Sequence, residues 1–253
     1  MKTIIEGARK LLIESLSLLG HSKEDVIIVG GWGPYLRHQD IHPGTKDVDI
    51  LFPESYSKEQ IQGLLEHFLD NDFFINAKHD FQLCRAYQIG NRRYIYNVDL
   101  LHPTEGKINK VDFINIMDLD ITVDGIIVKP IITINILHGD VMYSEKLFEK
   151  VTFQDQTFNV LDGAGIVISK IDSCTNKKRP RDIFDIYLSL KEPNVIEKLK
   201  FLNRLNPHLA KAFEKYSSSF ETNWPYFEKN LKEFGIDEAN AKEILSLNTV
   251  TEF

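Results

Sequence analysis

A short, wholly apolar segment that ends in two glycines constrains the fold of this chain more than any other feature. Residues 26–29 read Val-Ile-Ile-Val, and Gly30 and Gly31 follow at once. A continuous apolar run of this length that stops at a turn signal is typical of a buried strand. Glycine also lets another group come close to the backbone. The segment therefore predicts a buried strand that ends at a turn open to a ligand.

Helical and strand patterns alternate on both sides of this segment. Apolar residues recur at helical spacing over residues 3–19, and a capping box begins a second predicted helix over 57–70. A strand is expected over 48–52, and two more over 81–89 and 93–101, joined by a tight Gly-Asn hairpin. The first part of the chain thus predicts a mixed sheet with flanking helices.

Strand signals stop after about residue 160, and helical spacing dominates from there on. Prolines and glycines separate six expected helices, at 162–175, 180–190, 193–203, 207–217, 222–233 and 237–247. The fold class expected is α/β (α+β). A mixed sheet with flanking helices would cover residues 1–150, and a C-terminal helical domain would cover residues 151–253.

The composition is that of a soluble globular protein, with 43% hydrophobic and 26% charged residues. The net charge of −7 gives no global basic footprint for nucleic acid. The N-terminus lacks the pattern of a signal peptide, and no apolar run is long enough to cross a membrane. Cys84 and Cys174 lie far apart and are expected to be reduced thiols. We expect a cytoplasmic protein that does not engage a membrane.

Two acids stand one residue apart at the start of the second predicted strand. Side chains alternate along a strand, so Asp47 and Asp49 share one face while Val48 and Ile50 point into the core. Two like charges side by side repel, and a cation would hold them together. Carboxylate oxygens suit Mg²⁺, which binds one or two carboxylates together with substrate phosphates and water.

A third acid, Asp99, lies within the otherwise apolar predicted strand 93–101, where a charge needs a reason. If that strand neighbours the strand of Asp47 and Asp49, three carboxylates converge as ligands for a pair of metal ions. One ion would activate an attacking hydroxyl and the other would hold a triphosphate. Mg²⁺ is the expected cofactor, with Mn²⁺ as a substitute.

The glycine turn supplies the second half of this predicted site. Gly30 and Gly31 end a strand and precede a short predicted helix, and backbone N–H groups at such a turn bind phosphate. Arg37 and Lys46 are candidate counter-charges for a bound triphosphate. Gly-Gly or Asp-x-Asp alone is a weak signal, but their order along the chain, followed by a distant single Asp, favours a site for a nucleoside triphosphate and metal.

These residues resemble the nucleotidyltransferase superfamily typified by DNA polymerase beta. Its members carry Gly-Gly or Gly-Ser after the first strand, an Asp-x-Asp pair on the next strand and a third acid on a later one. In this sequence Gly30-Gly31, Asp47-Val-Asp49 and Asp99 match those positions. The segments around the glycines and the acid pair are similar both to aminoglycoside nucleotidyltransferases and to AbiEii-type toxin nucleotidyltransferases.

A second segment favours the AbiEii-type group. Residues 166–170 end in a lysine within a predicted helix, and residues 176–188 hold a basic turn and then Arg-Asp-x-x-Asp at the start of the next helix. The resemblance spans about residues 25–190. It implies that Lys170 and Asp182 belong to the catalytic set and that Lys170 binds the nucleotide or positions the acceptor.

Ordinary structural roles stay open for these residues. Asp182 would suit the first turn of a helix, where the dipole favours a negative charge, and it shares a helical face with Asp185. Lys170 would lie on a mostly apolar helix and could extend to the surface. The dense basic patch is either a solvated turn or a phosphate-binding element. It consists of Lys177, Lys178, Arg179 and Arg181.

Two histidines four residues apart, His38 and His42, could share a metal if they lay on a helix. Pro43 and Gly44 instead predict a loop, and the sequence shows no third ligand. Trp32, next to the glycines, has two explanations, stacking on a nucleobase or packing in the core.

The function expected is metal-dependent transfer of a nucleoside monophosphate from a nucleoside triphosphate to an acceptor. The acceptor could be tRNA, a protein or a small molecule, and an AbiEii-like toxin would have a cognate antitoxin as partner. Two alternatives remain open. One is an aminoglycoside-type antibiotic nucleotidyltransferase, and the other is a catalytically silent protein that binds a nucleotide or a protein partner.

Overall fold

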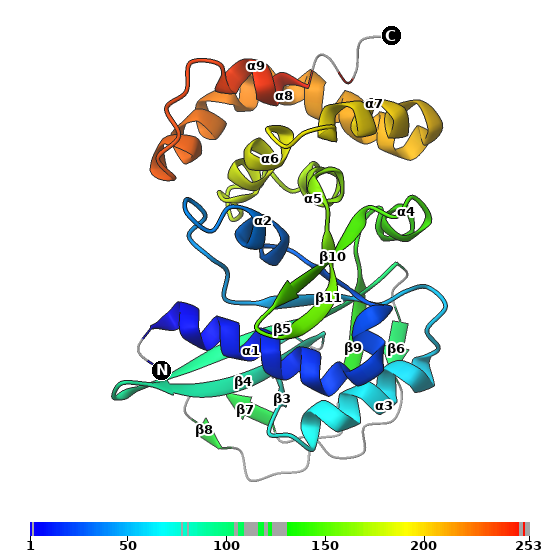
Figure 1. Ribbon diagram of the computed structural model, residues 1–253, viewed down its shortest axis with the longest axis vertical. Coiled ribbons are helices and arrows are strands. Elements are labelled where there is room, and N and C mark those ends of the chain that lie inside the picture. The colour runs from blue at the N-terminus through cyan, green and yellow to red at the C-terminus, as the bar shows by residue number, and fades with distance from the viewer. Residues whose placement is uncertain are drawn as a thin grey trace.

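The computed structural model shows a mixed sheet at one end of the molecule and a stack of helices at the other (Figure 1). It describes residues 1, 3–76, 78–79, 81–103, 106–108, 116–118, 121–122, 131–247 and 250. The mixed α/β architecture expected from the sequence is confirmed.

The described strands follow the order β10-β11-β1-β2-β5-β4-β3-β7-β8, and β9 adds to β5 and pairs with β6. Neighbours pair in parallel at β1/β11, β2/β5, β5/β9 and β3/β7, and antiparallel elsewhere. The strand bounds are β1 Ile27–Val29, β2 Val48–Leu51, β3 Phe74–Asn76, β4 Gln82–Ile89, β5 Arg92–His102, β6 Gly106–Ile108, β7 Ile116–Asp118, β8 Ile121–Thr122, β9 Ile131–Asn135, β10 Phe148–Phe153 and β11 Gln156–Leu161.

The helices begin at caps that the sequence supplies. Thr3 and Ser57 each form a capping box with the residue three positions later, which fixes the starts of α1 and α3. The helix bounds are α1 Ile4–Leu19, α2 Trp32–Arg37, α3 Lys58–Leu69, α4 Gly139–Ser144, α5 Gly163–Lys170, α6 Asp182–Leu190, α7 Val195–Leu205, α8 Pro207–Glu233 and α9 Ala241–Ser246, with a 3-10 turn η1 over Gly20–Glu24.

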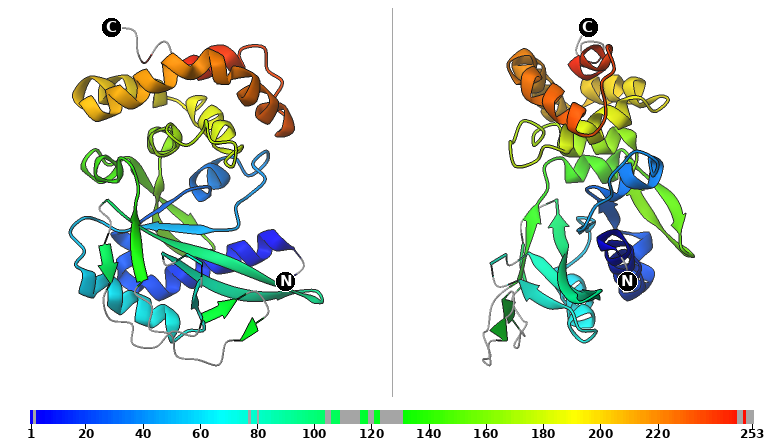
Figure 2. Two further views of the ribbon diagram at one scale, coloured as in Figure 1. Left: turned by 180° about the vertical axis from the view of Figure 1, so that it is seen from behind. Right: turned by 90° about the vertical axis from the view of Figure 1, so that its left-hand side faces the viewer.

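The two faces of the sheet are covered by different helices. Along β1, Ile28 joins the apolar cluster of α1 and α3, whereas Ile27 and Val29 join the cluster of α4 to α9. The views of Figure 2 show α1 and α3 on one side of the sheet and the later helices stacked beyond its end. Because Leu51 and Leu101 belong to the second cluster, residues two positions before them on β2 and β5 face the helices. These residues are Asp49 and Asp99.

Helix α8 runs without interruption where the sequence predicted two helices, 207–217 and 222–233. Pro225 lies inside it rather than at a boundary. The aromatic side chains of Phe213, Tyr216, Phe220 and Phe227 recur at helical spacing and are all buried. Their burial outweighs the backbone hydrogen bond that proline removes, so the expected break was wrong.

A hairpin that the sequence pattern did not predict extends the sheet. Strands β10 and β11 pair antiparallel, and β11 then pairs in parallel with β1. The hairpin lies across residue 150, at which we expected the first domain to end. The side chains of β10 are exposed or half-buried throughout, so its apolar signal is weak.

Candidate active site

Two of the predicted acids lie side by side at the sheet surface that faces the helices. Strands β2 and β5 are parallel neighbours, and Asp49 stands directly opposite Asp99 in their register. Val48 and Ile50 are fully buried on the other face, as the alternation predicted. The expected convergence of acids from two distant segments is therefore real for this pair.

Gly30, at the end of β1, makes room for one of these carboxylates. Its φ is +69°, a left-handed conformation that favours glycine. A Cβ added at Gly30 would overlap the Oδ2 atom of Asp49. The glycine is therefore required by its backbone conformation and by the close approach of the Asp49 side chain.

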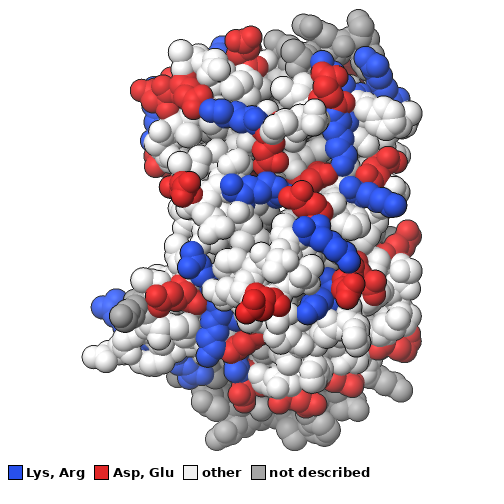
Figure 3. All heavy atoms as spheres, in the orientation of Figure 1, with Lys and Arg blue, Asp and Glu red and all other residues white. Residues whose placement is uncertain are grey.

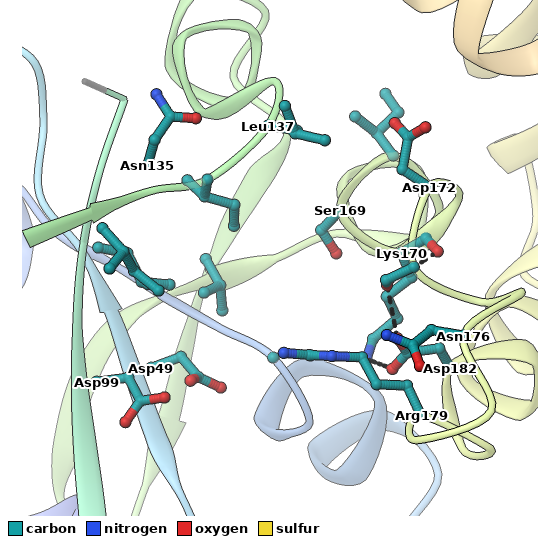
Figure 4. A pocket seen from close by; sticks show the side chains of 17 residues that line it. Asp49, Asp99, Asn135, Leu137, Ser169, Lys170, Asp172, Asn176, Arg179 and Asp182 are labelled. Atoms are coloured by element: carbon teal, nitrogen blue, oxygen red, sulfur yellow. Dashed lines mark hydrogen bonds and ion pairs between the residues drawn. The ribbon is translucent and has the colours of Figure 1, made fainter. Parts of the chain in front are cut away.

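A pocket of about 450 Å³ opens between the acids and helix α5. Of the nine residues predicted for the site, Gly30, Asp49, Asp99, Lys170 and Asp182 line it. Figure 4 shows Asp49 and Asp99 on the strand side of the pocket and Lys170 and Asp182 on the helix side, with Arg179 extending between them. Carboxylates and cations thus face one another across one cavity.

Lys170 is buried rather than extended to the surface, so that ordinary explanation was wrong. Its Nζ atom lies 2.8 Å from Asp182 Oδ1 and 3.0 Å from Asp185 Oδ2. Burial alone would lower the pKa of Lys170, but the two carboxylates outweigh it and raise the pKa. Lys170 is therefore a permanent cation whose head group is held by two acids of α6.

Asp182 and Asp185, the two acids that hold Lys170, each have further polar partners. The hydroxyl of Ser173 donates to Asp182 Oδ2 at 2.6 Å. Burial would raise the pKa of Asp185, but Lys170, a hydrogen bond from His42 and the charge of Arg181 outweigh it and lower the pKa. Both acids of the Arg-Asp-x-x-Asp segment share one face of α6, as their spacing of three predicted.

Asp47 lies next to the pocket rather than in its lining. The indole Nε1 of Trp32 donates to the backbone oxygen of Asp47 at 2.9 Å, and the Trp32 ring is buried among core residues. Of the two explanations for Trp32, the structure thus supports core packing. Arg181 donates to Gly44 O at 2.7 Å, just before Asp47 in the chain. Hydrogen bonds from Trp32 and Arg181 therefore hold the loop segment that leads through Asp47 into β2.

The two counter-charges that the sequence suggested do not line the pocket. Arg37 pairs with Glu149 at 2.6 Å and with Glu192 at 3.7 Å, at positions the linear sequence does not bring near it. Lys46 is exposed, and its charge only opposes the burial that raises the pKa of Asp47. Gly31 is the N-cap of α2, and a Cβ added at this position would collide with the side chains of Arg181 and Thr45.

Arg179 and Gln82 are functional candidates that the sequence did not single out. Arg179 belongs to the predicted basic patch, and it alone among the four lines the pocket. Gln82 donates from Nε2 to Asp99 Oδ1 at 2.7 Å and accepts a hydrogen bond from Asn76 at 2.5 Å. Gln82 is the first residue of β4, an ordinary strand by its sequence, so its pairing with Asp99 appears only once β4 lies against β5.

Burial dominates the protonation of the three acids. Together with the neighbouring charges of Asp99 and Asp47, it raises the pKa of Asp49 to about 7. Burial likewise raises the pKa of Asp99, against the hydrogen bond from Gln82. It raises the pKa of Asp47 too, although the charges of Arg181 and Lys46 oppose it. Without a cation, the cluster resists full ionisation.

The donor set fits a divalent cation that completes its coordination with substrate. Within the described part of the chain, no three His, Cys, Asp or Glu side chains form a ready metal-ligand group. Asp49 and Asp99 nevertheless supply two adjacent carboxylates that repel and stand at the edge of an open cavity. This matches Mg²⁺, which takes one or two carboxylates and obtains other oxygens from phosphates and water.

Among the described residues, no helix is both long and apolar enough to cross a membrane.

Solved structures that are similar to this chain share little sequence identity with it. An antigenic nucleotidyltransferase-like protein from Paracoccidioides brasiliensis is 14% identical, with a TM-score of 0.40, and the match covers 82% of this chain and 92% of that one. The Helicobacter pylori protein JHP933 is 12% identical, with a TM-score of 0.45, and the match covers 96% of this chain and 88% of that one. No curated protein sequence matches the chain.

The model of the family described as "Nucleotidyl transferase AbiEii toxin, Type IV TA system" matches residues 18–247. The match includes both strands that carry Asp49 and Asp99 and both helices that carry Lys170 and Asp182. The chain therefore belongs to the AbiEii toxin family of nucleotidyltransferases.

Proposed function

We propose that this nucleotidyltransferase transfers a nucleoside monophosphate from a nucleoside triphosphate to an acceptor hydroxyl, with Mg²⁺ or Mn²⁺ as cofactor. The observation that carries the proposal is the pairing of Asp49 with Asp99 on one side of a pocket whose other side holds Lys170 and Arg179. Asp49 and Asp99 thus face Arg179 and a lysine that Asp182 and Asp185 hold in place. This arrangement suits a magnesium triphosphate, which presents a cation and several anionic oxygens to the same site.

Asp47, Asp49 and Asp99 would hold the metal, which neutralises phosphate charge when bound. Gly30 and Gly31 would approach the β- and γ-phosphates at the end of β1, and Lys170 and Arg179 would supply positive charge. In the reaction the acceptor oxygen attacks the α-phosphorus, its proton passes to Asp99, and the bond to the bridging oxygen breaks so that pyrophosphate leaves with the electron pair. Most of the rate gain would come from positioning and charge neutralisation.

Asp182 would act through Lys170 rather than on the substrate. It holds the lysine ammonium in place, and it also lines the pocket. We propose that Arg179 takes the counter-charge role first expected of Arg37, because Arg37 is paired with two glutamates away from the pocket.

The acceptor remains one of three classes, tRNA, a protein or a small molecule. Lys and Arg side chains alternate with Asp and Glu over the face seen in Figure 3. The net charge of −7 and this mixed distribution give no extended basic surface for a long nucleic acid. They favour an acceptor that contacts the protein only near the pocket. Family membership further supports a cognate antitoxin as a functional partner.

The test is transfer of label from each of the four [α-³²P]NTPs, with Mg²⁺, to separate pools of tRNA, total protein and aminoglycosides. Asp49→Asn and Asp99→Asn should each reduce transfer by at least 100-fold, because a catalytic metal would lose a charged ligand. Asp237→Asn, at a largely exposed aspartate before α9, is the matched control and should retain the wild-type rate. Wild-type protein that binds Mn²⁺ and NTP but labels no pool would favour the catalytically silent alternative.

A further inference from the structure

The loop between α2 and β2, residues 38–47, carries Asp47 into the site without helix or strand structure of its own. His42, Gly44 and Thr45 are nevertheless buried within it. A loop that leads to a proposed metal ligand must be fixed by side-chain contacts, because its backbone lacks the ladder bonds of a sheet.

His42 makes two directed hydrogen bonds at the centre of this loop. Its Nδ1 lies 3.0 Å from the backbone N of Gly44, which has only a proton to offer, so Nδ1 accepts. Nε2 therefore carries the ring proton and donates to Asp185 Oδ1 at 3.0 Å. Both side chains have an exposure of 0%. The ring also stacks on Phe184, with 5.8 Å between the ring centroids.

The carboxylate that accepts from His42 is also the one that holds Lys170. Asp185 Oδ1 faces His42, and Oδ2 faces the ammonium of Lys170 at 3.0 Å. A single carboxylate thus connects the acid-bearing loop on one side with the pocket cation on the other. Moving His42 would release the loop and also change the surroundings of Lys170.

We propose that His42 is a positioning residue for nucleotidyl transfer, which acts through Asp185 to hold Asp47 and Lys170 at a fixed separation. This inference rests on the proposed function. It assigns His42 a role that zinc binding does not explain, because its two ring nitrogens are already engaged by Gly44 and Asp185.

Three substitutions separate the contacts of His42. His42→Phe keeps an aromatic ring against Phe184 and removes both hydrogen bonds. His42→Gln keeps an amide N–H at about the reach of Nε2, whereas His42→Asn is one methylene shorter and cannot reach Asp185. His38→Phe is the matched control, because His38 belongs to the same loop and bonds to Glu192 at 3.1 Å near the surface.

Two quantities would be measured for each variant. One is labelled transfer from [α-³²P]NTPs to the pool that the wild-type chain labels, and the other is Mn²⁺ binding by EPR with a mixture of the four α,β-methylene NTPs. His42→Phe and His42→Asn should lower the maximal transfer rate by roughly 10- to 100-fold and weaken Mn²⁺ binding, as expected for a misplaced catalytic group. His42→Gln and His38→Phe should stay within about threefold of wild type.

The proposal is overturned if folded His42→Phe protein transfers label at the wild-type rate, or if His42→Gln is as impaired as His42→Asn. Circular dichroism identifies variants that fail to fold, and if His42→Phe is among them, the comparison of Gln with Asn decides. A wild-type chain that labels no pool contradicts the proposed function instead. In that case equal Mn²⁺ affinities of the Gln and Asn variants would still count against the role of His42.

Discussion

Gly30 and Asp49 compete for the same space as soon as residue 30 has a side chain. A comparison of Gly30 with Gly20 separates this steric overlap from backbone strain. Gly20 also has a positive φ, of +57°, but a side chain added there would meet open space. The ψ of Gly20 is −123°, outside the left-handed helical region, and a residue with a side chain in such a sparsely populated conformation costs about 1–3 kcal/mol.

We expect Gly30→Ala to abolish Mn²⁺-dependent NTP binding, because the added methyl group displaces the Asp49 carboxylate. Gly20→Ala should lower the free energy of unfolding by about 1–3 kcal/mol and leave binding intact. Urea denaturation and EPR titration measure the two effects. Intact Mn²⁺ binding in folded Gly30→Ala protein would contradict the proposed role of Asp49.

Metal affinity should depend on pH through Asp49. Its folded-state pKa is raised to about 7 by burial and by Asp99 and Asp47, and a bound cation requires the ionised form. Mn²⁺ binding should therefore tighten by about tenfold between pH 6 and pH 8. The free energy of unfolding of the metal-free protein should change in the opposite direction. Because the pKa of Asp49 is higher in the folded than in the unfolded chain, its contribution to stability decreases as pH rises from about 4 toward 7. Asp49→Asn should flatten both profiles, and unchanged profiles in that variant would assign the titration to another group.

At the level of single residues, the sequence predicted the two acids on the strand side of the pocket but not all of the cations that face them. Asp49 and Asp99 were predictable because a charge within an apolar strand has few explanations. Arg37 was a poor candidate because its partners, Glu149 and Glu192, lie far along the chain. Arg179 could not be distinguished from the three neighbouring basic residues, since only the folded turn determines which one enters the pocket.

Helix α8 illustrates how packing overrides a local signal. Pro225 is exposed and has no N–H to offer, so one hydrogen bond of the helix ladder is missing there. Pro225→Ala should raise the free energy of unfolding by about 1–2 kcal/mol, since proline costs about 3 kcal/mol in a helix interior and part of this is offset in the unfolded chain. Urea denaturation measures the gain, and a loss of stability would mean that the packing of α8 depends on Pro225.

Elements with strong local signals were predictable, and those with mixed signals were not. The apolar spacing of α1, the capping box at Ser57 and the alternation on β2 each predicted their elements from sequence. Strand β10 was missed because its side chains meet solvent, which gives no clear period. The pairing of β11 with β1 is a tertiary contact that no local pattern encodes.

At the scale of the whole molecule, the larger hydrophobic core is built by the sheet and the C-terminal helices together. Ile27, Val29 and Leu51 from the sheet belong to the same buried cluster as residues of α5 to α9. The division at residue 150 that we expected from the sequence stays a proposal. A shared core predicts that the two parts unfold together, whereas independent domains would unfold separately.

The two tryptophans offer one probe for each part, since Trp32 lies in α2 and Trp224 in α8. Trp224→Phe leaves a probe in the sheet part, and Trp32→Phe leaves a probe in the helical part. We expect the two proteins, followed by fluorescence in urea, to show single transitions that coincide with the circular dichroism of each. A fluorescence transition that precedes the circular dichroism transition would show two independently unfolding units.

The pairing of β1 with β11 has a consequence for the order in which the protein is made. The Asn159 amide donates to Val26 O, 133 residues earlier, and β1 has no partner on that side before β11 is translated. A ribosome delivers all three acids well before Lys170 and the α6 acids. A nascent or prematurely terminated chain therefore carries the proposed metal ligands without the opposing cation, and we expect it to be inactive until the last elements of the pocket have been synthesised and folded.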